Sequence, residues 1–328
     1  MLLIAGFKKD LKDFAKKEII PFCSSIIELS PSKFLINADF KKIIINSFIV
    51  ESLHELVAEF SKVSDISGDI FKKFIKKNES FKVKCNEKQV CIDLGQAIKD
   101  GAECAVSLDN PDKTFFAEKI DEKYYCYLAI HGAEDLSKRG YASNNNEFIP
   151  ADAAKALADF SGYNDDGNLL DAFSHEGYII IECALKLLKV GPAYFNSKNF
   201  DFEFPEPKVK PLKHKLFCSS DSMADLKFAK QNAKLSKTFK FIDFNISTLN
   251  DLDYAFKENT FDYFISALPK KISMEKLFFQ LDYIMKKKCV VVILSSESIE
   301  GLFEEFGFKI TNSMQLLGKK AFKLERGF

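Results

Sequence analysis

Residues 171–182 are the part of this chain whose side chains are best arranged for chemistry. The segment runs Asp171-Ala-Phe-Ser-His-Glu-Gly177 and leads directly into the apolar run 178–181 and Glu182. This order is typical of a strand end, a tight loop and a helix start, which together set a ligand against the N–H groups of the helix terminus. A backbone that closes on a ligand favours small residues, whereas positions 175 and 176 hold His and Glu. The segment therefore predicts a ligand site with a crowded loop.

The composition indicates a soluble protein of two or three domains. The chain has 328 residues, 47% of them apolar, and no apolar run long enough to span a bilayer. Its first residues, Met1-Leu-Leu-Ile-Ala5, are followed by Gly6 and then by two lysines, which favours a first strand over a signal peptide. We therefore expect a cytoplasmic protein with no membrane partner.

Positive and negative charges balance over the whole chain, but lysines are in excess in its N-terminal part. Lys plus Arg and Asp plus Glu both number 47, so the net charge gives no case for nucleic-acid binding. Residues 1–90, however, hold 16 lysines and 12 acidic residues. This excess is compatible with a solvated helix face and also with a surface that faces phosphates.

The cysteines favour a reduced protein without a metal site. None of the eight forms a CxxC motif or a Cys/His cluster with zinc-like spacing, and most have apolar neighbours. We expect core thiols in a reducing compartment. The cysteines are Cys23, Cys85, Cys91, Cys104, Cys126, Cys183, Cys218 and Cys289.

The first 132 residues favour an α+β module, because helical and strand patterns interleave without βαβ regularity. Apolar residues recur at helical spacing in residues 8–20, 69–77 and 92–99. Runs with strand character occupy residues 2–4, 25–29, 34–37, 81–85, 104–108, 114–118 and 124–129.

The order of predicted strands and helices changes after residues 140–150, which are polar and rich in turn formers. Pro150 can open a helix at its first turn. Beyond this boundary strands and helices alternate, which predicts a parallel sheet covered on both faces. Predicted helices cover residues 151–161, 178–189, 223–234, 274–286 and 297–306. Predicted strands cover residues 169–170, 214–218, 239–244, 263–267 and 289–294, and residues 308–325 predict a terminal hairpin.

A colinear series of short motifs resembles the THUMP-containing guanine-N2 RNA methyltransferases over nearly the whole chain. The motifs of this family read roughly L-x-K-R-G-Y, then P-A-x-L, then D-P-F-C-G-S-G-T-I-x-I-E-A-A. The matching stretches here are Leu136-Ser-Lys-Arg-Gly-Tyr141, Pro150-Ala151 and residues 171–184. Farther back, Phe81-Lys-Val-Lys-Cys85 and Leu108-Asp-Asn-Pro-Asp112 look like the THUMP strand and its L-x-N-P-D turn.

The resemblance implies an α/β chain in which an N-terminal module precedes a Rossmann-like class I methyltransferase domain. We expect a ferredoxin-like α+β part in residues 1–65 and a THUMP RNA-binding domain in residues 66–140. A linker and connecting helix would occupy residues 141–165, and the methyltransferase domain residues 166–328.

The resemblance also implies a site for S-adenosylmethionine. Asp171, Phe173 and Gly177 match the first cofactor motif, and Ser174 lies within it. Asp221 and Ser222, in Ser219-Ser-Asp-Ser222, resemble the family's G-S-D-I, where the carboxylate accepts hydrogen bonds from a ribose diol. Asp221 could instead cap the following helix. Asn245 stands where the family places an Asp at the adenine edge, and its amide oxygen can still accept one hydrogen bond.

The catalytic motif departs furthest from the family. There an N-P-P-Y motif follows the fourth strand, so that an Asn side chain and a Pro carbonyl hold the target amine while the ring stacks on the flipped base. The matching residues are Ser266, Ala267, Leu268, Pro269 and Lys270. Only Pro269 is retained, and loss of one positioned polar group typically costs on the order of a hundred- to thousand-fold in rate.

Four basic residues are candidates for RNA contact by this resemblance: Lys82, Lys84, Lys138 and Arg139. A solvated basic turn is an equal explanation for the last two. His175 is a solvent-facing loop residue, a plug in the cofactor cavity, or a residue with a ligand or acid–base role. We expect a protein that binds structured RNA, tRNA first, with an eroded methyl-transfer site. The alternatives are an active methyltransferase with an altered site, in which Ser266 or the Pro269 carbonyl orients the amine, and a scaffold with a protein partner.

Overall fold

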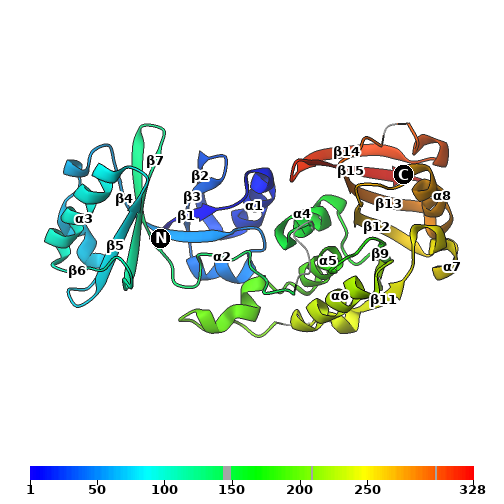
Figure 1. Cartoon of the computed structure of the whole chain (residues 1–328), viewed down its shortest axis with the longest axis horizontal. Helices are drawn as coiled ribbons and strands as arrows, with labels where there is room; N and C mark the ends of the chain where they lie inside the picture. The colour runs from blue at the N-terminus through cyan, green and yellow to red at the C-terminus, as the bar shows by residue number, and fades with distance from the viewer. Residues whose placement is uncertain (143–148, 208–209, 300) are drawn as a thin grey trace. The chain divides into compact units, whose positions relative to one another are not determined.

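The computed structural model describes residues 1–142, 149–207, 210–299 and 301–328, and these divide into two compact units (Figure 1). Unit 1 comprises Met1–Ser137 and Asn196–Glu203, and unit 2 comprises Lys138–Phe195 and Phe204–Phe328. Residues 196–203 belong to unit 1, where the ring of Phe202 packs against that of Phe40 at a centroid distance of 5.9 Å.

Unit 1 is built on one eight-stranded sheet, in the order β2-β3-β1-β4-β8-β7-β5-β6. Its strands are β1 (Leu2–Gly6), β2 (Cys23–Ser30), β3 (Lys33–Ala38), β4 (Ser52–Phe60), β5 (Ser80–Cys85), β6 (Ala105–Val106), β7 (Lys113–Ile120) and β8 (Lys123–Ala129). Its helices are α1 (Lys12–Ile19), α2 (Phe40–Asn46) and α3 (Lys88–Ala102), with 3-10 turns η1 (Lys9–Leu11), η2 (Ile20–Phe22), η3 (Val63–Asp65) and η4 (Gly68–Lys73).

Strand β4 joins the two halves of this sheet, because it pairs with β1 on one side and with β8 on the other. The sequence pattern did not reveal it. A bulge between Leu56 and Ala58 breaks the alternation of buried and exposed residues that marks a strand. The division of this module at residue 65 stays a prediction, since both parts share the same sheet.

One helix expected in unit 1 is shorter and tighter than its periodicity suggested. Residues 69–77 were expected to be helical, and the structure has the 3-10 turn η4 there. Phe71 and Ile75 are buried, which accounts for the helical spacing. Gly68 packs so closely on Gly101 of α3 that a Cβ at Gly101 would lie 2.1 Å from the Gly68 carbonyl oxygen. This contact fixes the chain before a full helix can develop.

Unit 2 contains a seven-stranded sheet in the order β11-β10-β9-β12-β13-β15-β14. The first five strands in this order are parallel, and the terminal hairpin is antiparallel. The strands are β9 (Leu169–Asp171), β10 (Leu216–Ser220), β11 (Ile242–Ile246), β12 (Phe261–Ala267), β13 (Met285–Ser295), β14 (Lys309–Leu316) and β15 (Lys319–Arg326). The fold class is therefore confirmed: an N-terminal α+β module precedes a Rossmann-like domain.

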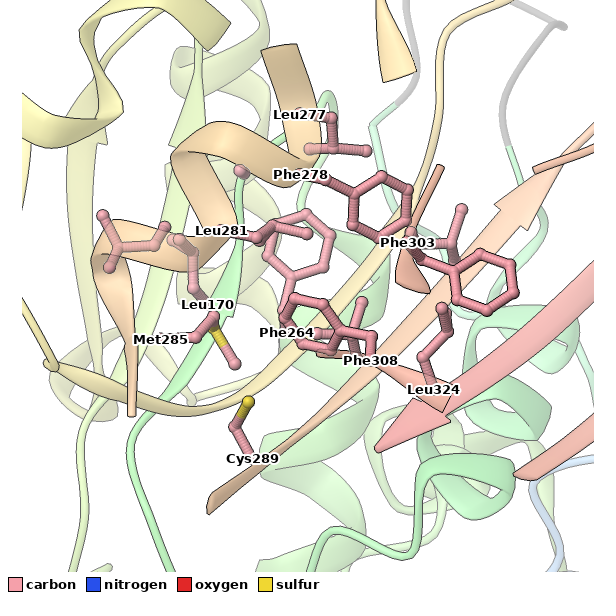
Figure 2. Close-up of a cluster of buried hydrophobic side chains, with 14 of the residues drawn as sticks. Leu170, Phe264, Leu277, Phe278, Leu281, Met285, Cys289, Phe303, Phe308 and Leu324 are labelled. Carbon is pink, nitrogen blue, oxygen red and sulfur yellow. The ribbon is translucent and has the colours of Figure 1, made fainter. Parts of the chain in front are cut away.

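Helices cover both faces of this sheet, with α4, α5 and α6 along one face and α7 and α8 along the other (Figure 1). They are α4 (Ala151–Ser161), α5 (Tyr178–Leu188), α6 (Met223–Leu235), α7 (Leu252–Ala255) and α8 (Met274–Ile284), with 3-10 turns η5 (Pro192–Asn199), η6 (Phe239–Phe241), η7 (Leu249–Asp251) and η8 (Glu304–Phe306). Figure 2 shows the core under α8, where Phe278 and Leu281 meet Phe264 of β12 and Phe308.

Several boundaries in unit 2 differ from expectation, as at β10, which runs from Leu216 to Ser220 and not from 214 to 218, and at three further elements. The helix predicted over residues 297–306 is reduced, among its described residues, to the short turn η8. The strand predicted over 239–244 starts at Ile242, after the turn η6. The helix predicted over 274–286 stops at Ile284, because Met285 already pairs with Phe261 as the first residue of β13.

Candidate functional site

The candidate site lies at the carboxyl edge of the unit 2 sheet. Strand β9 stands between β10 and β12. The strands that follow β9 are therefore added first on one side of it, as β10 and β11, and then on the other, as β12 and β13. Ligands of open α/β sheets bind at such a switch point in the strand order. A cavity of about 360 Å³ opens there, beside Asp171. It is lined by Ile149, Asp171, Phe173, Ser174, His175, Glu176, Tyr178, Ile179, Asp225, Ala267, Leu268, Pro269, Lys270 and Lys319.

Asp171 ends β9 and is almost completely buried. The Ser266 hydroxyl donates a hydrogen bond to its carboxylate, and the Ala172 N–H donates to the Ser266 oxygen at 3.0 Å. Burial raises the pKa of Asp171 from its ordinary 3.8 to about 6, although hydrogen bonds from Ser266 and Ser174 and the nearby His175 oppose this rise. A buried carboxyl with such a pKa is typical of ligand and active sites.

Backbone hydrogen bonds hold the loop after Asp171, one within the loop and one to β10. The Ser174 N–H donates to the Ser219 carbonyl at 2.9 Å, and the Gly177 N–H donates to the Ser174 carbonyl at 2.6 Å. Gly177 has φ +81°, and a Cβ there would lie 2.9 Å from the Cβ of Ala229. Glycine is thus required at position 177 both by conformation and by space.

His175 adopts φ +36°, which is unfavourable for a residue with a side chain. Its Nδ1 lies 3.2 Å from the Asp225 carboxylate of α6, and its side chain is one-third exposed. It lines the cavity, as does Tyr178, whose ring lies 5.2 Å from that of Tyr141. His175 therefore forms part of the cavity wall and is not simply a solvent-facing loop residue.

The corner after β12 brings two aliphatic side chains, those of Ala267 and Leu268, to the cavity. Ser266 is fully buried, and its hydroxyl is engaged with Asp171, so its position does not support the alternative in which it orients a substrate amine. Ala267, Leu268, Pro269 and Lys270 line the cavity. Neither Ala267 nor Leu268 has a polar side-chain atom, and Leu268 also packs into the core under α8.

Asp221, Ser222 and Asn245 lie on the same edge of the sheet, but they do not line this cavity in the described part of the chain. Asp221 is exposed beyond the end of β10. Ser222 caps α6, because its hydroxyl accepts the Asp225 N–H at 3.2 Å, so the alternative in which Asp221 caps this helix is wrong. Asn245 pairs in register with Ser219, and its carbonyl accepts the Ser219 hydroxyl at 3.3 Å.

The four basic residues proposed for RNA contact differ in position. Lys138 is exposed, whereas Arg139 is buried and makes a two-pronged ion pair with the fully buried Glu182, at 3.0 and 3.1 Å. A guanidinium in this position fixes the chain and is not presented to phosphates. In unit 1, Lys84 is exposed on β5, and the Lys82 ammonium donates to the Leu108 carbonyl at 3.3 Å.

Sequence reasoning missed Asp225 and Lys319, and nothing in their local sequence distinguishes them from ordinary surface residues. Asp225 comes to the cavity from α6 and Lys319 from the terminal hairpin. Among the described residues the structure has no group of three metal-ligating side chains, and the eight cysteines are unbridged, five of them buried. No helix within the described ranges is both long and apolar enough to cross a membrane.

Comparison with known proteins identifies the fold alone. No family model and no curated protein matches this sequence. Among solved structures, TrmN from Thermus thermophilus superposes with a TM-score of 0.74 at 15% identity, covering 99% of each chain. A possible methylase from Clostridium difficile 630 gives 0.73 at 18% identity, covering 100% of this chain and 98% of its own. SMU.472, complexed with SAH, gives 0.76 at 15% identity, with coverages of 100% and 98%. The chain has the fold of these methyltransferase structures over its whole length.

Proposed function

We propose that this protein binds structured RNA, tRNA in the first instance, and that its methyl-transfer site no longer supports catalysis. The observation that carries the loss of catalysis is the corner formed by Ala267 and Leu268. Transfer to an exocyclic amine needs acceptors that hold its protons while the nitrogen attacks. At this corner the side chains of Ala267 and Leu268 offer no acceptor, and the neighbouring Ser266 hydroxyl donates to Asp171 instead.

The residues present also fit S-adenosylmethionine poorly. Asp171 borders the cavity, but Asp221 and Asn245, which by resemblance would hold the ribose and the adenine, do not. His175 and Tyr178 occupy positions on the wall where the family has Gly and Thr. A site that holds one part of a long ligand but not the others loses much of its binding energy.

RNA binding is supported by the resemblance of residues 81–85, 108–112 and 136–141 to motifs of the THUMP family. The turn Leu108–Asp112 lies at the surface, with the Leu108 side chain 72% exposed. The Asp112 carboxylate accepts both the N–H and the hydroxyl of Ser80 at 2.7 Å, which ties this turn to the start of β5. Lys84 on β5 is exposed and Lys82 is partly exposed, so both ammonium groups are within reach of a phosphate backbone.

One observation favours the alternative, an active methyltransferase with an altered site. The cavity beside Asp171 has a volume of about 360 Å³, within the roughly 300–1,000 Å³ typical of small-molecule sites. The Pro269 residue of the family motif also borders it. In this alternative the Pro269 carbonyl would be the main acceptor for the amine.

Two titrations of the purified full-length protein separate these functions. We expect bulk tRNA to bind with an affinity that falls steeply as salt increases, and S-adenosylmethionine at 1 mM to produce neither heat nor a thermal shift. A cofactor present at 100 times its Kd would stabilise the fold by about 2.7 kcal/mol, a shift that is readily seen. Cofactor binding would favour the enzyme, and failure to bind tRNA would remove the RNA-binding proposal.

A further inference from the structure

Helix α6 and the turn that follows it carry a strongly basic surface. Residues 226–242 contain five lysines and no acidic residue, in a chain whose charges balance overall. All five lysines are exposed. We call this set the α6 lysine face: Lys227, Lys230, Lys234, Lys237 and Lys240.

The helix presents three of these lysines on its solvent side. Lys227, Lys230 and Lys234 are spaced by three and four residues, so they share one side of α6 and extend over about 10 Å of its length. The opposite side, with Ala229 and Ala233, is buried against the sheet. The row of charge is therefore fixed on a packed element and does not belong to a loose loop.

The acidic residues at the two ends of the segment are already engaged. The Asp225 carboxylate lies 3.2 Å from His175, and the Asp243 carboxylate accepts from Lys215 at 2.9 Å. Neither competes directly for the five lysines, so the positive potential of the α6 lysine face is not cancelled from its flanks.

Aromatic rings lie between the lysines. The Lys234 ammonium is 5.3 Å from the ring centroid of Phe239, and the Lys230 ammonium is 5.8 Å from that of Phe244. These two rings stack on each other with centroids 5.5 Å apart, and Phe239 remains 40% exposed. Cation–π contact holds the ammonium groups near the rings while the exposed part of Phe239 stays available for stacking.

A shallow groove accompanies the lysines along α6. It is lined by Met223, Leu226 and Leu235 together with three members of the α6 lysine face. Met223 and Leu235 are 68% and 49% exposed. Apolar side chains beside ammonium groups match the two parts of a nucleotide, since bases are flat and apolar on their faces and phosphates are anionic.

From this combination we infer that the α6 lysine face binds an unpaired segment of RNA. The lysines contact successive phosphates, and one unstacked base lies on Phe239. An unpaired segment fits better than a duplex because only splayed bases can reach an aromatic ring on a convex helix surface. This inference rests on the proposed RNA binding and adds to it a contact on unit 2, separate from the cavity at Asp171.

Substitution of three lysines tests the inference on the full-length protein, with bulk tRNA as the probe. K227Q/K230Q/K234Q keeps good helix formers on an exposed face, so we expect the thermal midpoint to stay the same. Three lost phosphate contacts lower the slope of log K against log salt by about 2 and weaken binding about 10- to 100-fold at 0.1 M salt. K227R/K230R/K234R retains the charge and is expected to bind like the wild type.

The matched control is K257Q/K276Q/K287Q, which removes the same charge from exposed positions after α7, on α8 and on β13. It should bind tRNA nearly as the wild type does. F239L, which keeps an apolar side chain next to Phe244 but removes the ring, is expected to weaken binding about 10-fold without changing the salt slope.

The outcomes distinguish this inference from the proposed function. If the wild type binds tRNA and both triple Gln variants bind equally well, the α6 lysine face is not an RNA site, while the proposed function stands. If the wild type itself fails to bind tRNA, the proposed function fails and this inference fails with it.

Discussion

Replacing Asp171 by asparagine is expected to stabilise the protein at neutral pH. The carboxyl is buried in the sheet edge, and burial raises its pKa from 3.8 to about 6. Between these two values the folded protein binds more protons at this group than the unfolded chain does. The stabilising effect of protonation is complete below pH 3.8 and is lost as the pH rises through 6, so the ionised Asp171 costs stability at pH 7 and above.

The size of this effect follows from the shift. A change from 3.8 to about 6 corresponds to about 3 kcal/mol at pH 8, and about half of that remains at pH 5. Asparagine has the same shape and no charge, and its amide oxygen can still accept the Ser266 hydroxyl, whereas its NH2 group cannot accept the bonds that Ser174 and the Phe173 N–H donate to the carboxylate. About 3 kcal/mol is therefore the upper limit of the gain for D171N at pH 8, which for a unit of this size raises Tm by up to about 6–12 °C.

Thermal unfolding of D171N and wild type at pH 8 and pH 5 measures both the gain and its pH dependence. The matched control is D221N, because Asp221 is exposed on the same edge of the sheet and its neutralisation should change Tm little at either pH. A gain that is equal at both pH values would refute the reasoning, since it would then arise from packing and not from the buried charge. So would a D171N protein that melts with the wild type at pH 8.

Three other predictions concern the buried ion pair, the contact at Gly177 and the lysines of β5. E182A leaves the buried Arg139 charge without its carboxylate and should cost about 3–5 kcal/mol in urea unfolding, whereas R139M/E182L should recover most of the loss. G177A should cost about 1–3 kcal/mol more than G318A, because both positions have positive φ but only a Cβ at Gly177 would collide with Ala229; equal losses would contradict the role of that contact. K82Q/K84Q should weaken tRNA binding and lower its salt slope by about 1–2, and an unchanged slope would remove β5 from the RNA surface.

Much of the methyltransferase-like unit could be predicted because its elements carry local signals. Pro150 precedes α4 directly, Gly177 opens α5, and the alternation of strands with helices specifies a parallel sheet. Asp171 could be placed at a strand end because its neighbours 169 and 170 are apolar and a loop follows.

Other features depend on contacts that no local pattern encodes. The pairing of His175 with Asp225 joins residues fifty positions apart, and the approach of Lys319 to the cavity depends on where the terminal hairpin packs. Arg139 looked like a surface base in a basic turn, yet its partner Glu182 lies 43 residues later, inside a helix. The hydroxyl of Ser266 donates to Asp171, which lies 95 positions earlier, and the sequence around Ser266 does not indicate this contact.

The proposed function depends on the inability of the corner after β12 to orient an amine. The protein then has the fold of a methyltransferase but does not catalyse methyl transfer. The most direct test of this proposal is incubation of the purified wild type with bulk RNA and S-adenosylmethionine labelled on the methyl group. We predict no label in the RNA above the level of a protein-free control. Label that accumulates over many turnovers with the wild type, and that disappears with D221A, would contradict the account.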